Sequence, residues 1–154
     1  MAKDIFSKAD QKLIVDAIKE AELDTSGEIR VHIDNTCKED VLDRAAYVFE
    51  TLKMHETELR NGVLFYVAYD DHKFAILGDA GLNAKVPENF WDSTKDEVIS
   101  MFKEGKYAQG LASGILKAGK ELKQHFSYQK GDVNELDNDI SFGSDAKNSE
   151  GSKE

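Results

Sequence analysis

A dense hydrophobic stretch between residues 61 and 83 predicts the hairpin at the centre of the fold. Residues 63–69 are apolar without a break and rich in β-branched and aromatic types, which is typical of a strand that is covered on both faces. Residues 70–72 form a polar reversal, and residues 73–77 return as a shorter strand. We therefore expect an antiparallel hairpin that ends at two glycines flanking Asp79.

Two helical patterns and one alternating pattern precede the hairpin. Ser7 and Asp10 resemble a helix start, and apolar residues then recur at helical spacing as far as Ala21. Residues 28–34 alternate strictly between polar and apolar side chains, which predicts a strand with one polar face. A second amphipathic helix is expected to begin at Asp40. Strand, helix and central strand form a βαβ unit, so we expect a right-handed crossover between parallel strands.

Two further helices are expected after the hairpin. Pro87 suits the first turn of the third helix, whose apolar stripe spans residues 91–102. The fourth helix carries a stripe over residues 111–126, and Gly110 with Gly114 leaves a smooth groove on a neighbouring surface. Because the lysines of this helix exclude a membrane span, we expect the groove to pack closely on the sheet.

These patterns together predict one α/β domain with a small mixed sheet and helices on both faces. The domain is expected to occupy residues 1–128. From residue 129 onward the composition changes to Gly, Asp, Asn, Ser and Lys, with too little apolar surface to offset the entropy of ordering. We therefore expect an acidic, largely flexible tail over residues 129–154. Four apolar residues in it are spaced as anchors along the domain, namely Val133, Leu136, Ile140 and Phe142.

The charge of the chain narrows the classes of partner. A formal net charge of -10 and an isoelectric point near 4.9 disfavour a nucleic-acid partner and an anionic membrane, because a surface of that sign repels phosphate. Cations and basic partners are favoured instead. No run of 18 apolar residues occurs. We expect a cytoplasmic, unanchored monomer that makes no membrane contact. Binding of an unidentified protein partner is compatible with this charge.

Oxygen ligands from distant parts of the chain are expected at one end of the predicted sheet. Glu28 lies at the start of the first strand, while Asp79 and Asn83 follow the return strand of the hairpin. Glu88 is expected in the first turn of the third helix. Together they give several hard oxygens around a glycine loop, the ligand type that Ca²⁺ and Mg²⁺ require. The alternative is that Asp79 and Asn83 bond only to their own turn backbone.

The opposite end of the sheet is a second candidate for cation binding. Asp34 ends the first strand, Asn35 and Thr36 follow it, and Asp70, Asp71 and His72 form the hairpin turn. Open α/β sheets usually bind ligands at the carboxyl ends of their parallel strands. The alternative is that these aspartates serve only the tight turn.

Other kinds of chemistry find little support in the sequence. Cys37 is the only cysteine, so no internal disulfide and no zinc site of several cysteines can form. None of the four histidines is paired with Cys37 by a known catalytic spacing. The phosphate-binding glycine loop, the nucleophile elbow and the His-Glu-x-x-His motif are absent. The row of Glu28, Arg30 and His32 fits cross-strand ion pairing on a solvated face.

Five short motifs follow one another in a characteristic order. They are Ser-Gly-Glu-Ile-Arg-Val at 26–31, Asn-Gly-Val-Leu at 61–64, Asp-His-Lys-Phe-Ala-Ile at 71–76, Gly-Asp-Ala-Gly-Leu-Asn at 78–83 and Phe-Lys-Glu-Gly-Lys-Tyr-Ala-Gln-Gly-Leu at 102–111. In this order the chain resembles the TPM-domain family, which includes thylakoid-lumen proteins of photosystem repair and many bacterial proteins. The resemblance covers roughly residues 7–126.

The resemblance implies a Rossmann-like α/β sandwich with a small acidic crevice, divalent-cation binding in some members and a phosphatase label for the family. Family members often carry Glu where Asn83 stands and Asp where Glu88 aligns, while Asp79 replaces a residue that is commonly not acidic. The carboxylates of the crevice are thus rearranged in this chain. Many relatives carry a signal peptide and a membrane anchor, so this chain resembles a short, soluble bacterial version.

The residues and the resemblance support three functional hypotheses. The first is a non-catalytic domain that binds a divalent cation, Ca²⁺ or Mg²⁺, through Glu28, Asp79, Asn83 and Glu88. The second is a metal-dependent phosphatase, in which the ion activates water and the ester is held by Arg30, Arg60 or Lys106. The third is a protein-interaction module that uses the C-terminal tail.

Overall fold

The computed structural model of the chain describes residues 6–23, 25–126, 136 and 138–143. Its strands are β1 (Glu28–Asp34), β2 (Gly62–Ala68), β3 (Lys73–Gly78) and β4 (Ser141–Phe142). They form one sheet in the order β3-β2-β1-β4, in which β1 pairs in parallel with β2 and β4, and β2 pairs antiparallel with β3. The predicted mixed sheet with a parallel β1–β2 pair and a β2–β3 hairpin is confirmed.

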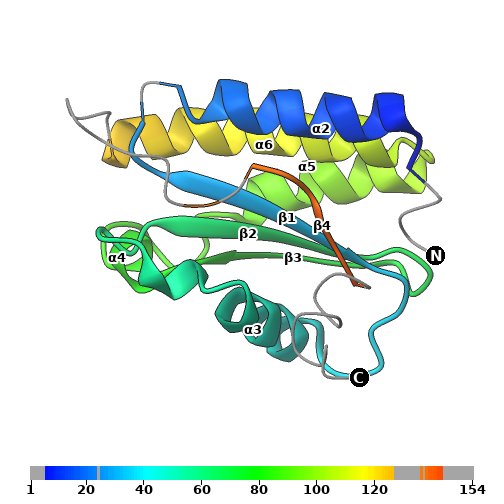
Figure 1. Cartoon of the computed structure of the whole chain (residues 1–154), viewed down its shortest axis with the longest axis horizontal. Helices are drawn as coiled ribbons and strands as arrows, with labels where there is room; N and C mark the ends of the chain where they lie inside the picture. Colours follow the sequence, from blue (N-terminus) through cyan, green and yellow to red (C-terminus); the bar gives the residue numbers. More distant parts are fainter. Residues whose placement is uncertain (1–5, 24, 127–135, 137, 144–154) are drawn as a thin grey trace.

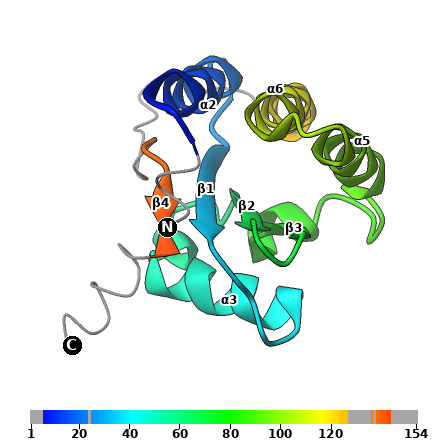
Figure 2. The same cartoon turned by 90° about the vertical axis from the view of Figure 1, so that its right-hand side faces the viewer.

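Helices lie on both faces of this sheet, as the sequence predicts. Figures 1 and 2 show three helices over one face, namely α2 (Lys8–Ala21), α5 (Asp92–Lys103) and α6 (Tyr107–His125). The other face carries α3 (Val41–Thr51), the 3₁₀ turn η1 (Met54–Glu56) follows it, and α4 (Ala80–Asn83) follows β3. Ser7 and Asp10 form the predicted capping box of α2, and the Asp40 side chain caps α3.

The core is divided into two layers by β2, whose seven residues are all buried. Val63, Phe65 and Val67 belong to the layer under α2, α5 and α6. Leu64, Tyr66 and Ala68 belong to the smaller layer against α3. Because side chains alternate across a strand, a strand that is apolar throughout must be covered on both faces, which places β2 at the centre.

Three of the four polar residues of β1 are buried and Arg30 is half-buried, contrary to the expectation of a solvated row. Glu28 and Asp34 are nearly inaccessible, and His32 has no exposed surface. Alternation of polar and apolar residues gives the same sequence pattern whether the polar side meets water or a set of buried hydrogen-bond partners. In β1 the polar side chains mainly meet buried hydrogen-bond partners.

Part of the predicted tail belongs to the sheet. The anchors Leu136, Ile140 and Phe142 are buried, and Ser141 and Phe142 pair with His32 and Ile33 of β1. These three anchors are therefore confirmed. The fourth predicted anchor, Val133, and the last dozen residues, apart from Gly143, lie outside the described residues.

The segment after β3 differs from the predicted single helix start. Asp79 caps the short helix α4, and Pro87 lies in a turn in which the Phe90 amide donates to the Pro87 carbonyl. Helix α5 begins only at Asp92, so Glu88 lies in the preceding turn and not in the first turn of a helix. Proline favours a helix start and a turn equally well, because both need its fixed φ.

The glycine groove of α6 packs mainly on α5 and not on the sheet alone. A Cβ atom added at Gly110 would lie 3.2 Å from Met101 Cβ, and one added at Gly114 would lie 2.5 Å from Val98 Cγ2 and 3.3 Å from Phe65 Cε2. The absence of side chains at these two positions lets the two helices approach closely.

Gly114→Ala should therefore destabilise the protein by about 1–2 kcal/mol, because the clash with the stiff Val98 side chain outweighs the helix propensity of alanine. Urea unfolding would measure the change. Ser113→Ala is the matched control, because Ser113 is the exposed neighbour on the same helix and should gain a few tenths of a kcal/mol. A neutral or stabilising Gly114→Ala would contradict the close approach of α5 and α6.

Candidate functional site

A buried polar cluster surrounds the carboxylate of Asp34 at the carboxyl end of β1. The carboxylate accepts hydrogen bonds from Tyr66 Oη at 2.6 Å and from Arg44 Nε at 2.9 Å, and it lies 2.8 Å from His32 Nε2. The other ring nitrogen, His32 Nδ1, lies 2.9 Å from Ser141 Oγ. We call these five residues the Asp34 cluster.

The register of the sheet builds this cluster. Tyr66 of β2 and Ser141 of β4 are both direct partners of His32, so the three side chains share one level across three strands. The His32 and Tyr66 rings stack with centroids 5.9 Å apart and planes at 8°. Asp34 lies two residues further along β1 and on the same face as His32. Arg44 reaches the carboxylate from the first turns of α3.

The electrostatics of the Asp34 cluster favour a permanent ion pair. Burial alone would raise the pKa of the Asp34 carboxyl, but the hydrogen bonds from His32, Arg44 and Tyr66 hold that pKa well below its usual range. The same carboxylate raises the pKa of Arg44 against the opposing effect of burial. Burial and Asp34 together raise the pKa of Tyr66. Asp34 is thus a structural anion and not a base near neutral pH.

Ser141, His32 and Asp34 are connected in the order of a hydrolytic triad, but their setting is structural. A nucleophilic serine must reach a substrate carbonyl, whereas Ser141 is 3% exposed and His32 is fully buried. The chain of hydrogen bonds joins residues that lie 109 positions apart in the sequence. Its direct effect is to fasten the end of the described chain to β1.

Two loops cross beside the Asp34 cluster. The Asp70 amide donates to the Asn35 carbonyl at 2.7 Å, and the Cys37 amide donates to Asp71 Oδ2 at 2.7 Å. Lys73 Nζ reaches the Cys37 carbonyl at 2.9 Å. We call residues 35–39 and 70–71 the loop pair. Figure 1 shows the connection from β1 to α3 and the β2–β3 turn at the same end of the sheet.

One oxygen at the loop pair lacks a partner. Asn35 Oδ1 is buried and accepts no hydrogen bond from any described residue. A buried amide oxygen without a donor costs about 1–3 kcal/mol, so such an atom calls for a ligand or a water. Asp70 is exposed, and Asp71 keeps one oxygen that lies 3.9 Å from Lys38 Nζ. The side chains of Asn35, Asp70 and Asp71 thus lie on two loops that are hydrogen-bonded to each other at this end of the sheet.

The four residues predicted as a metal site at the other end have mostly separate partners. The Asp79 carboxylate accepts hydrogen bonds from Nε and Nη2 of Arg60, at 2.7 and 2.8 Å. Glu28 Oε1 accepts the Leu136 amide at 2.5 Å, and Asn83 Nδ2 donates to the Gly78 carbonyl at 2.9 Å.

Only Asp79 and Asn83 are brought together, at the two ends of the short helix α4. Glu28 begins β1, which is separated by β2 from the end of β3, a distance of roughly 10 Å at ordinary strand spacing. Glu88 is exposed in its turn. Within the described ranges, no three His, Cys, Asp or Glu side chains gather closely enough to hold a metal ion. Metal binding by Glu28, Asp79, Asn83 and Glu88 stays a prediction.

Comparison with known proteins identifies the family. The family model described as the TPM domain matches residues 2–121. The chain belongs to the TPM-domain family. Its fold is similar to the NMR structure of the BA42 protein from the psychrophilic bacterium Bizionia argentinensis, with a TM-score of 0.84 and 50% sequence identity over 90% of this chain and 95% of that chain. None of the curated proteins matches the chain.

The TPM-domain match ends before Ser141, so the Asp34 cluster is completed by a residue beyond the matched range. Sequence reasoning missed this cluster because it placed His32 in a solvated row and assigned Asp34 to a candidate cation site with the hairpin turn. The available signal was the pair of ionisable residues two positions apart on a strand next to the fully apolar β2.

No helix in the described part of this TPM domain has the length and apolarity needed to cross a bilayer.

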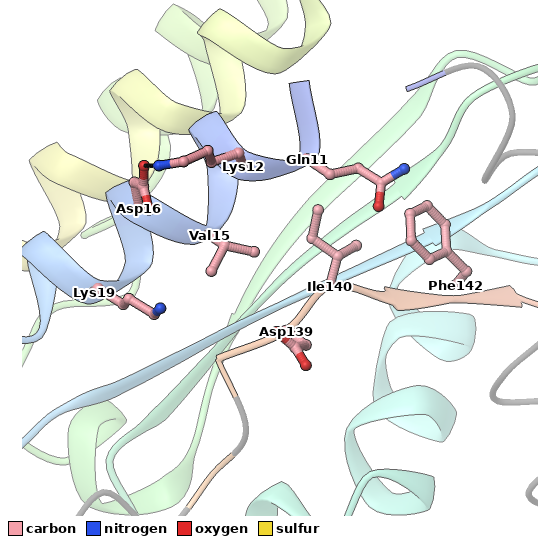
Figure 3. A pocket seen from close by; sticks show the side chains of 8 residues that line it. All are labelled: Gln11, Lys12, Val15, Asp16, Lys19, Asp139, Ile140 and Phe142. Atoms are coloured by element: carbon pink, nitrogen blue, oxygen red, sulfur yellow. Dashed lines mark hydrogen bonds and ion pairs between the residues drawn. The ribbon is translucent and has the colours of Figure 1, made fainter. Parts of the chain in front are cut away.

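A shallow groove of about 500 Å³ separates α2 from the edge strand β4 of the TPM domain. Figure 3 shows Ile140 and Phe142 on one side of it and Val15 on the other, with an ion pair between Lys12 and Asp16 at its upper border. The ion pair is exposed, with an N–O distance of 2.6 Å. An exposed pair of this kind contributes little to stability.

Proposed function

We propose that this TPM domain binds Ca²⁺ or Mg²⁺ without catalysing a reaction and that the ion stabilises the fold. The observation that carries the proposal is the buried, unpartnered Asn35 Oδ1 beside the acidic turn of the hairpin. Both ions take oxygen ligands from carboxylates, amide side chains, backbone carbonyls and water. The formal net charge of -10 adds a general attraction for cations.

The loop pair fits a cation better than the end of the sheet that carries Asp79. At the loop pair, Asn35 Oδ1 is free of donors among the described residues, and Asp70 forms part of an exposed turn. At the other end, the bidentate contact with Arg60 already neutralises Asp79. A cation bound by Glu28, Asp79, Asn83 and Glu88 would first have to displace Arg60, whose side chain is 47% exposed.

The metal-dependent phosphatase is the less favoured alternative. Of the basic groups expected to hold a phosphate ester, Arg60 is paired with Asp79, and Lys106 lies 3.2 Å from Glu104. These pairs reduce the positive charge available to an ester. Turnover of a chromogenic phosphate ester in the presence of Ca²⁺ or Mg²⁺ would favour this alternative over the non-catalytic domain.

Thermal unfolding with EDTA and with millimolar Ca²⁺ or Mg²⁺ tests the cation proposal. An ion that binds only the folded state adds about 2.7 kcal/mol at a hundredfold excess over its Kd. For a chain of this length we expect Tm to rise by about 5–10 °C. An unchanged Tm with both ions would contradict the proposal.

Two matched variants separate the two ends of the sheet. Asp70→Asn should remove most of the ion-dependent rise in Tm, whereas Asp79→Asn should leave that rise unchanged even if it lowers the Tm in EDTA. The opposite pattern would place the ion at the Asp79 end. An amide NMR titration gives an independent assignment, because residues 35–39 and 70–71 should shift first if the loop pair binds the ion.

A further inference from the structure

An aromatic pocket lies between the start of β3 and the adjoining ends of α5 and α6. It has a volume of about 400 Å³ and is lined by His72, Phe74, Ile99, Phe102, Lys103 and Tyr107. A volume of this size is typical of small-molecule pockets, which are mainly apolar with a few convergent polar groups. Figure 2 shows α5 and α6 side by side on this face of the sheet.

The walls of the pocket are rings that hold one another in place. Phe74 and Phe102 meet edge to face with centroids 5.4 Å apart, and Phe102 stacks on Tyr107 at 4.6 Å. Tyr107 also packs against Tyr69 at 4.7 Å. Phe102, Tyr107 and Ile99 remain partly exposed, so they offer flat apolar surface that is already ordered. A planar ring can stack on such a surface with little loss of side-chain entropy.

The charge of this pocket is opposite to that of the whole chain. Lys103 gives the lining its positive charge, His72 lines it as a hydrogen-bonding group, and no carboxylate lines it among the described residues. Lys103 forms no ion pair within the described part of the chain, whereas the nearby Lys106 is held by Glu104. The amino end of α6, which adds partial positive charge, begins at Tyr107 and has no side-chain cap.

Two hydrogen-bonding groups complete the mouth of the pocket. His72 Nδ1 lies 3.3 Å from Tyr107 Oη. Burial and the neighbouring Tyr69 raise the pKa of Tyr107, so its hydroxyl keeps its proton near neutral pH. His72 has a positive φ of 55°, a conformation that glycine or asparagine adopts more easily. Its imidazole is thereby directed from a tight turn to the edge of the pocket.

We propose that this pocket binds a small planar aromatic carboxylate. The ring would stack among Phe74, Phe102 and Tyr107, while the carboxylate would meet Lys103 and His72. A neutral ring would use only the apolar walls, and a ring with an ammonium group would be repelled by Lys103. This proposal is independent of cation binding at the loop pair.

Amide NMR titration of the full chain in EDTA tests the proposal with three probes of one shape. They are 2-naphthoate, 2-naphthalenemethanol and 2-naphthylmethylammonium. We expect 2-naphthoate to shift amides of residues 72–74 and 99–107 with a Kd of about 1 mM, an ordinary value for a ligand of this size. The alcohol should bind more weakly and the ammonium probe weakest. Equal binding of all three, or shifts centred elsewhere, would overturn the proposal.

Charge reversal at the pocket gives a second test. Lys103→Glu should weaken 2-naphthoate about five-fold, because loss of an exposed ion pair costs up to this factor and repulsion from the new glutamate adds to a smaller loss. The same variant should strengthen the ammonium probe. Lys120→Glu, an equal change on the exposed surface of α6, should alter neither. Ile99→Trp should fill the pocket and abolish the shifts with little change in Tm. Unchanged probe affinities in both pocket variants would refute the assignment.

Discussion

Asp34→Ala should lower the free energy of unfolding by about 3–5 kcal/mol, the usual cost of removing one partner of a buried ion pair. The substitution would leave Arg44, Tyr66 and His32 facing a cavity without their shared acceptor. For a chain of this length, Tm should fall by roughly 6–20 °C. Urea and thermal unfolding of the purified variant would measure both quantities.

Two further variants make the Asp34 result interpretable. Asp34→Asn keeps the size of the side chain and one acceptor oxygen. It should therefore lower the free energy of unfolding by less than Asp34→Ala does. Asp16→Ala removes an aspartate from the exposed pair with Lys12 and should cost about 0.5 kcal/mol or less. An Asp34→Ala cost below about 1 kcal/mol would show that the buried ion pair makes no net contribution.

Glu22 should make the protein less stable as the pH rises from 5 to 8. Burial raises the pKa of its carboxyl to about 7, against the opposing hydrogen bond from the Ile29 amide. The unfolded chain loses this proton near pH 4.5, so in the interval the folded state binds a proton that the unfolded state has released. The stabilisation is complete below pH 4.5 and is lost through pH 7, a change of about 3 kcal/mol.

Glu22→Gln tests this dependence, because an amide oxygen can still accept the Ile29 hydrogen bond but does not titrate. Denaturant unfolding at pH 5, 6, 7 and 8 should show the variant more stable than the parent at pH 8, with the difference vanishing at pH 5. Glu20→Gln, at an exposed position in α2, the helix that ends just before Glu22, should follow the parent protein. Parallel curves for all three proteins would refute a raised pKa for Glu22.

The two carboxyls act in separate pH windows. The pKa of Asp34 is lowered, so its contribution is present above about pH 4, the unfolded value, and is lost as the pH falls through the folded one. Asp34 is fully ionised in both states above pH 5. The difference in stability between the parent and Glu22→Gln across pH 5 to 8 therefore reports on Glu22 and not on Asp34.

Periodic patterns predicted the architecture where they were long. The stripes of α2, α3 and α6 and the apolar run of β2 each repeat often enough to define a period, and the βαβ rule then fixed the parallel direction of β1 and β2. Short elements lacked such a signal. β4 has two residues and α4 has four, so neither shows a period.

The candidate site was harder to predict because it depends on pairings between distant residues. The sequence indicated polar, oxygen-bearing residues at both ends of the sheet. It could not show that Asp79 is held by Arg60 or that Asp34 is held by Arg44 and Tyr66. The sequence does not show whether a carboxylate is available to a cation or is already paired with an arginine. Only the register of the strands and the positions of the helices show this.

The parallel pairing of β1 with β4 has a consequence for biosynthesis. His32 emerges from the ribosome 109 residues before Ser141, which at 5–20 residues per second is a delay of roughly 5–20 s. During that time the nascent chain carries β1 as an unprotected edge, open to pairing with other polypeptides. Synthesis of Ser141 and Phe142 thus ends the period in which the edge of β1 is unpaired, and we expect chaperones to associate with the growing chain before that point.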